Sequence, residues 1–193
     1  STTSQSVHDQ IVKQRECYWL HEECFEHPIR DGEFSAGELT TLEGMELNKK
    51  QMLDKWHSFS SDIITKGKVC ITEGCLLHAI DRYLLISAWE DEQILQYYAE
   101  VMKILMPLTP LIVFLCKSDL KSSFEAAYKV RGDWWRDLIL KRPQSYGYFK
   151  THEYTGDESV YAAITHEQNK MAMVFESLNC DKLMIDTTEE KWD

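Results

Sequence analysis

The sequence has little positive charge for its size: 21 lysines and arginines stand against 32 aspartates and glutamates, a net charge of −11. A protein that binds nucleic acid or an anionic membrane surface non-specifically needs an excess of basic residues, because its contacts are to phosphates. We therefore expect no nucleic-acid partner and no membrane partner. A small phosphorylated ligand remains compatible with this composition, since a few local arginines are sufficient to bind it.

Long apolar runs and paired cysteine motifs are also lacking. The longest apolar stretch, 104–116, contains Pro107 and Pro110 and is too short to span a bilayer. No CxxC pair occurs, and the cysteines lie in apolar surroundings at positions 17, 24, 70, 75, 116 and 180. This pattern is typical of buried, reduced thiols, so we expect a cytoplasmic protein.

The chain is rich in residues that build a core: 44% are hydrophobic, with six Trp, nine Tyr and seven Phe in 193 residues. Short apolar runs predict strands at 17–20, 68–72, 110–115 and 182–186. Apolar residues at helical spacing and helix-start signals predict helices at 2–16, 47–65, 75–87, 91–106, 119–141 and 158–178. Alternation of strands and helices indicates an α/β fold, a doubly wound parallel sheet with helices on both faces, in a single domain 1–193. The continuous apolar run at 110–115 further predicts a strand buried on both faces.

Polar residues follow each predicted strand. They are His21-Glu22-Glu23, Glu73-Gly74, Lys117-Ser118-Asp119 and Asp186-Thr187-Thr188. In open α/β sheets, ligands bind outside the carboxyl ends of the strands. A carboxylate such as Glu73 at the end of a buried strand either faces a ligand or pays a large desolvation cost. This edge is therefore the expected site.

Four segments carry a resemblance to a known superfamily. "STTSQSVHDQIV" (1–12) resembles the part of a P-loop, GxxxxGK[ST], that follows its GK. "KVCITEGCLLHAIDRYL", "PLIVFLCKSDLKSSFEAAYKVRGDWW" and "KLMIDTTEEKW" resemble the third-strand, lid and final-strand regions of P-loop nucleoside and nucleotide kinases. An uncharacterised bacterial group of the same type has a similar pattern to Glu22-Glu23, His27-Pro28, Trp56…Phe59, Glu73…Leu77 and Arg131-Gly132…Trp134. Residues 1–193 contain no GxxxxGK, so the chain resembles an N-terminally incomplete P-loop kinase-like domain.

The resemblance implies phosphoryl transfer from ATP, with Mg²⁺, to a small acceptor, and a nucleoside or nucleotide is favoured. Without the P-loop we expect impaired activity. Among the residues, the resemblance implies Mg²⁺ ligation by Ser1 and Glu73, with Glu22 as general base and Arg131 as phosphate clamp. For the remaining roles it implies nucleotide binding by Ser1, Thr2, Arg136, Asp186 and Thr187, acceptor binding by Glu23, His27, Trp56 and Phe59, and a lid over 131–157.

Several alternatives stay open. Ser1 can equally be a frayed terminus, either Glu22 or Glu23 can contact the acceptor, and Arg131 fits a salt-bridged helix surface. His21, Cys24 and His27 have a spacing compatible with zinc but lack a fourth ligand. The whole chain can also be a non-catalytic relative that binds ligands or proteins, or a kinase for a sugar or antibiotic. A central strand missing from the sheet would leave open edges, which self-association into a homo-oligomer could cover.

Overall fold

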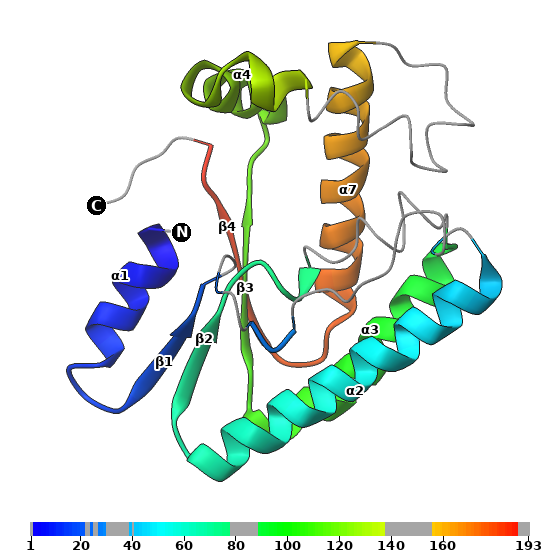
Figure 1. Ribbon diagram of the computed structural model, residues 1–193. Coiled ribbons are helices and arrows are strands. Elements are labelled where there is room, and N and C mark those ends of the chain that lie inside the picture. The colour runs from blue at the N-terminus through cyan, green and yellow to red at the C-terminus, as the bar shows by residue number, and fades with distance from the viewer. Residues whose placement is uncertain are drawn as a thin grey trace.

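The computed structural model describes residues 2–21, 24, 27–29, 39, 41–77, 89–137 and 156–188, and the structural statements below concern these residues. They form an α/β protein with parallel strands. The elements follow in the order α1 (Thr2–Ile11), β1 (Cys17–Leu20), α2 (Leu42–Lys66), β2 (Val69–Thr72), α3 (Asp91–Leu105), η4 (Met106–Leu108), β3 (Leu111–Cys116), α4 (Leu120–Arg131), α7 (Asp157–Ser177) and β4 (Asp181–Asp186). Figure 1 shows all of these strands pointing the same way, with α2 against α3.

The strands form two parallel pairs. β1 pairs with β2 from Cys17↔Val69 to Leu20↔Thr72, and β3 pairs with β4 from Leu111↔Asp181 to Cys116↔Asp186. The predicted strands are thus confirmed to within a residue at each end. The pairs belong to two separate two-stranded sheets rather than to one continuous sheet.

Local capping explains where the helices differ from expectation. α2 begins at Leu42, ahead of the predicted residue 47, because Thr41 Oγ1 accepts a hydrogen bond from Gly44 N at 3.1 Å. It ends at Lys66, one residue beyond the predicted end, where Gly67 (φ 61°) caps the helix. α4 stops at Arg131 because Gly132 (φ 80°) breaks the helix, and helical backbone resumes at 133–137.

The remaining helices agree with their predicted bounds to different degrees. α1 ends at Ile11, short of the predicted residue 16. α3 and α7 are confirmed to within a residue. Residues 75–77 are not α-helical, and the rest of the helix expected at 75–87 lies outside the described residues.

The main hydrophobic core lies between α2 and α3. Two polar contacts fix these helices together: Ser60 Oγ donates to Ile104 O at 3.0 Å, and Lys49 Nζ lies 2.8 Å from Glu100 Oε1. The most deeply buried side chains of this core include Met52, Trp56, Ile94, Tyr97, Tyr98, Val101 and Val174. β1, β2 and β3 each contribute a side chain that packs against it, namely Leu20, Cys70 and Ile112.

The expectation that β3 is buried on both faces is wrong. Phe114 is buried at 7% exposure, because its ring packs 5.6 Å from Phe175 of α7. On the opposite face Leu111 and Val113 are 62% and 46% exposed. Helix α7 covers one face only, and an apolar run by itself does not tell how many layers will cover a strand.

The helices of the described residues include none that combines the length and apolarity needed to cross a membrane. All six cysteines are free thiols.

Candidate functional site at the carboxyl ends of β1 and β2

Glu73 is the residue on which the candidate site is built. It directly follows β2, and its backbone N–H still donates to Leu20 O of β1 at 3.3 Å, which fixes its position. Its side chain is only 13% exposed. The carboxylate therefore lies in a partly desolvated position at the carboxyl edge of a parallel sheet, as expected from the sequence.

Two side chains from other elements contact this carboxylate. Ser4 in the first turn of α1 donates its hydroxyl to Glu73 Oε2. His21, which follows β1, has Nε2 at 3.2 Å from Glu73 Oε1. Three segments of the chain thus meet at the Glu73 carboxylate, and the contacts from Ser4 and His21 fix the directions of its two oxygens.

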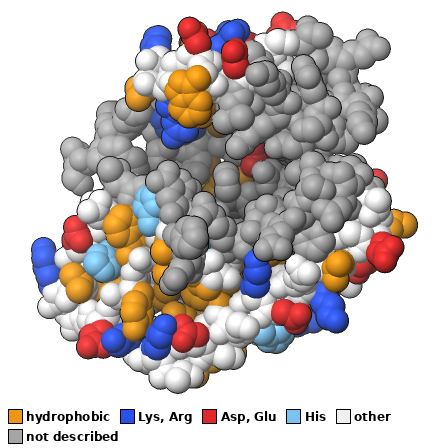
Figure 2. Space-filling model, in the orientation of Figure 1, with side chains coloured by type: hydrophobic (Ala, Val, Ile, Leu, Met, Phe, Trp, Pro, Cys, Tyr) orange, Lys and Arg blue, Asp and Glu red, His pale blue; other side chains and the backbone are white. Residues whose placement is uncertain are grey.

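Aromatic contacts position His21. Its ring lies edge-on to Trp19 at 5.4 Å between centroids, and Trp19 also lies 6.1 Å from His8 of α1. Figure 2 shows histidine side chains beside hydrophobic ones on the face where α1 and β1 lie. The row His8–Trp19–His21 therefore joins α1 to the end of β1.

Gly74 follows Glu73 with φ +68°, a left-handed conformation in which a residue with a Cβ is strained. Beyond it, Tyr98 Oη of α3 donates to Leu76 O at 3.0 Å. The backbone after Glu73 thus turns sharply and is held to the core.

The side-chain oxygens of Glu73 and Ser4 are of the kind that could hold Mg²⁺. Carboxylate and hydroxyl oxygens are hard ligands, and Mg²⁺ is commonly held by one or two carboxylates together with substrate phosphates. Glu73 and Ser4 supply such oxygens. The described residues hold no group of three or more His, Cys, Asp or Glu side chains able to bind a metal, so the His21, Cys24 and His27 alternative has no support among them.

A second polar cluster follows β3 and β4. Thr187 donates both its N–H (2.9 Å) and its Oγ1–H (3.1 Å) to Cys116 O. Asp186 accepts hydrogen bonds from the Thr188 side chain and from the Thr188 N–H. Both bonds lower the pKa of the Asp186 carboxyl, and the side-chain bond is the larger cause. Asp186 and Thr187, both expected to bind nucleotide, therefore make local contacts that order the ends of β3 and β4.

Gln168 of α7 binds the same region. Its Oε1 accepts from Lys117 N at 3.1 Å, and its Nε2 donates to Lys117 O at 2.9 Å. A side-chain amide thus satisfies both backbone groups of the residue that follows β3.

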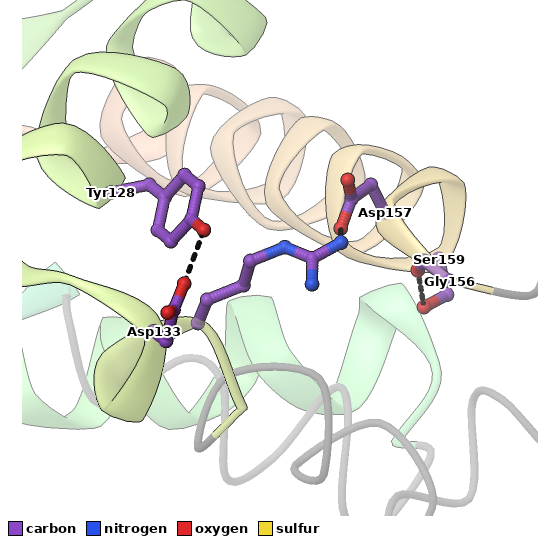
Figure 3. Close-up of polar contacts among 6 residues, drawn as sticks. Tyr128, Asp133, Gly156, Asp157 and Ser159 are labelled. Carbon is purple, nitrogen blue, oxygen red and sulfur yellow. Dashed lines mark hydrogen bonds and ion pairs between the residues drawn. The ribbon is translucent and has the colours of Figure 1, made fainter.

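The two expected lid arginines make internal contacts. Arg136 Nη2 lies 2.8 Å from Asp157 Oδ1 at the start of α7, and its guanidinium lies over the Tyr128 ring at 5.6 Å. Figure 3 shows Asp157 at the start of α7 with its contact dashed, and Tyr128 directed at Asp133. Arg131 stacks on Trp135 at 5.2 Å. In Figure 1, α4 lies well apart from β1 and β2.

The expected acceptor-binding residues lie around α2. Trp56 and Phe59 are buried at 3% and 7% exposure and pack edge to face at 5.9 Å. Phe59 and Pro28 also line an open cavity of about 360 Å³ together with Asp54, Lys55, Ser58 and Asp62. His27 is buried, and its Nδ1 accepts from Ile29 N at 3.2 Å.

Some expected site residues lie outside the described part of the chain. They are Ser1, Glu22, Glu23 and lid residues 138–155. Thr2 begins α1, and its side chain is likewise outside what is described.

Sequence reasoning missed Ser4 and Asn48. Ser4 is one of four hydroxyl residues at the start of the chain, and only the packing of α1 selects it. Asn48 is 1% exposed, and neither amide atom of its side chain has a hydrogen-bond partner among the described residues. Its position between Met45 and Met52 on the apolar side of α2 was the available signal.

Comparison with known proteins found no matching family model, no matching curated protein and no matching solved structure.

Proposed function

We propose that this chain is a P-loop kinase-like protein that takes part in phosphoryl transfer from ATP, with Mg²⁺, to a small acceptor. The proposal rests on one observation, the Glu73 carboxylate that Ser4 contacts at the carboxyl edge of β1 and β2. A nucleoside or nucleotide is the favoured acceptor, because the sequence segments around this edge resemble kinases of those substrates. The proposal includes a cytoplasmic location, since all six thiols are free.

The physical case concerns charge. Phosphoryl transfer requires little covalent help from the protein but needs positioning and neutralisation of the phosphate oxygens. Bound Mg²⁺ would supply positive charge to those oxygens, and Glu73 with Ser4 would hold it. The N-terminal N–H groups of α1 are close to Ser4 and favour an anionic ligand there.

His21 has a supporting role in this proposal. Its contact with Oε1 and the Ser4 bond to Oε2 keep the Glu73 carboxylate in one orientation. Residues 1–193 contain no GxxxxGK motif, so we expect an affinity for MgATP in the millimolar rather than the micromolar range.

Isothermal titration with MgATP tests the proposal. We expect Glu73→Gln to weaken binding by about tenfold or more, equivalent to about 1.4 kcal/mol. Asp181→Asn is the matched control, because it removes a strand carboxylate at the opposite, amino end of β4. Equal binding by wild type and Glu73→Gln would refute the role of Glu73.

The acceptor is tested separately, by ADP release in the presence of nucleosides, nucleoside monophosphates, sugars or aminoglycosides. Release with a nucleoside or nucleotide alone supports the favoured acceptor. Release only with a sugar or an aminoglycoside would replace that acceptor while leaving phosphoryl transfer in place.

A second candidate function is non-catalytic binding of a ligand or protein. It is favoured by the contacts of the two arginines, since Arg136 is paired with Asp157 and Arg131 is stacked on Trp135. MgATP binding with no ADP release in the presence of any of these acceptors would favour this candidate.

A further inference from the structure

The surface at the end of α4 is a feature that the proposed function does not use. Lys129, Val130 and Arg131 are all exposed, and so is Trp134 just beyond the helix; these four residues form the α4 patch. Val130 is 87% exposed and Trp134 is 67% exposed. Figure 2 shows hydrophobic side chains beside basic and acidic ones at the top of the molecule, over α4. Tryptophan and arginine are enriched at protein interfaces, so the α4 patch is a candidate interaction surface.

The α4 patch is held on a rigid base. Trp135 packs against the buried ring of Phe124 at 5.4 Å between centroids. Phe124 in turn meets Tyr161 of α7 edge to face at 5.5 Å. The guanidinium of Arg131 lies over the Trp135 ring at 5.2 Å. Arg131 is thus positioned before any partner arrives, which lowers the entropy lost when it binds.

The cations of the α4 patch lack acidic partners. Neither Lys129 nor Arg131 forms an ion pair with any other residue that the structure describes. Asp133, which is close to them in the chain, accepts a hydrogen bond from Tyr128 instead (Figure 3). The patch therefore presents two cations without ion-pair partners on a chain whose net charge is −11.

These features define the chemistry of a partner. A carboxylate suits Arg131, because a planar guanidinium can donate two parallel hydrogen bonds to the two carboxylate oxygens. Apolar side chains suit Val130 and Trp134, because covering exposed apolar surface removes it from water. Nucleic acid and anionic membrane surfaces suit the patch less well, since the rest of the chain would repel them.

We propose that the α4 patch binds an acidic segment of a partner protein that also carries apolar side chains. A carboxylate of this segment pairs with Arg131, and Lys129 attracts a second one. An apolar side chain next to the carboxylate covers Trp134 and Val130. The inference goes beyond the proposed function and is independent of it, because α4 lies well apart from β1 and β2 in Figure 1.

Phosphate is the main rival ligand. Arginine binds phosphate as well as carboxylate, and the resemblance to P-loop kinases implies that Arg131 contacts it. Inorganic phosphate gains nothing from Val130 and Trp134, however, because it has no apolar part. A segment with both acidic and apolar side chains uses the whole patch. MgATP and inorganic phosphate are therefore included as separate arms of the experiment.

NMR titration of the full chain with two peptides tests the proposal. The acidic peptide has the sequence Glu-Leu-Glu-Glu-Leu-Glu, and the basic peptide has lysine in place of each glutamate. The reporter is the indole N–H signal of Trp134, assigned by its loss in Trp134→Phe. We expect the acidic peptide to shift this signal with a Kd below about 1 mM and the basic peptide to leave it unchanged. Added NaCl should raise the Kd, because salt screens exposed charges.

Arg131→Gln and Arg15→Gln form a matched pair of variants. Each removes an exposed guanidinium, but Arg15 follows α1 and lies outside the α4 patch. We expect Arg131→Gln to raise the Kd of the acidic peptide by about tenfold or more, and Arg15→Gln to leave it unchanged. If Arg131→Gln fails to fold, Val130→Glu decides instead. Val130 is almost fully exposed, and a carboxylate at this position should repel the acidic peptide and abolish its binding.

Four results would overturn the proposal. The first is equal binding of the acidic and basic peptides, or binding of neither. The second is acidic-peptide binding that Arg131→Gln or Val130→Glu leaves unchanged. The third is a shift of the Trp134 signal by MgATP or phosphate but not by the acidic peptide, which would assign the patch to a phosphate ligand. The fourth is a dimer in sedimentation that Trp134→Ala abolishes, which would assign the patch to a second copy of the chain.

Discussion

Asn48 is the buried residue whose replacement should stabilise the protein. It lies on the core side of α2 at 1% exposure, and its amide nitrogen and oxygen lack hydrogen-bond partners in the described part of the chain. Folding therefore removes both polar atoms from water without compensation. Leucine has the same branched shape without polar atoms, so we predict that Asn48→Leu raises the free energy of unfolding.

The size of the effect follows from two contributions. An uncompensated buried amide costs about 1–3 kcal/mol in proteins. Leucine also has the better helix propensity, by up to about 0.5 kcal/mol. Because leucine is larger than asparagine, packing strain offsets part of the gain, and we expect a net stabilisation of about 1 kcal/mol. For a chain of this length, that corresponds to a rise in Tm of about 2–4 °C.

Urea denaturation and thermal melts measure this change, and Ser60→Ala provides the contrast. Ser60 is a buried polar residue on the same helix, but its hydroxyl donates to Ile104 O at 3.0 Å. Removing that bond should lower stability by about 1 kcal/mol. The reasoning fails if Asn48→Leu is as destabilising as Ser60→Ala, since Asn48 would then have a partner that matters.

Three further predictions concern other residues. Burial raises the pKa of the Cys70 thiol to about 11. Tm should therefore fall between pH about 9 and 11, because the thiol ionises in the unfolded chain before it ionises in the folded one. Thermal melts of Cys70→Ala should show a smaller decline in Tm over this range. Thr188→Val should raise the pKa of Asp186 in a carboxyl NMR titration, because the Thr188 hydroxyl bond is the largest cause of its lowered value. An unchanged titration would contradict this assignment. Trp56→Ala should lower the free energy of unfolding in urea by about 3–5 kcal/mol, because Trp56 is buried in the core. Trp134 is exposed, so Trp134→Ala should change that free energy by less than about 0.5 kcal/mol. Similar losses in the two variants would refute the core position of Trp56.

The sequence was most informative where a pattern is local. The strands at Cys17–Leu20 and Leu111–Cys116 were predicted closely, because short apolar runs are bounded by charged or proline residues. The end of α2 was predicted to within a residue, because the apolar pattern stops just before Gly67 and a left-handed cap favours glycine. The start of α2 was missed because the capping residue, Thr41, precedes a first turn with few apolar residues.

Features that depend on distant packing were not accessible in the same way. The apolar run predicted that β3 is a strand, but it did not predict that one face of β3 is exposed. That exposure depends on which helices pack against the strand. The position of Glu73 at the end of β2 was predicted from the strand pattern. The choice of Ser4 as its partner depends on the angle at which α1 lies against β1 and β2, which no local pattern encodes.

The contacts of α7 have a mechanical consequence. This 21-residue helix is tied to the 133–137 segment at its first turn through Asp157 and Arg136, and to the end of β3 through Gln168. The two ties are eleven residues apart, about 16 Å along a stiff rod. Because one continuous helix makes both contacts, α7 connects the 133–137 segment to the Lys117 peptide at the carboxyl edge of the second sheet.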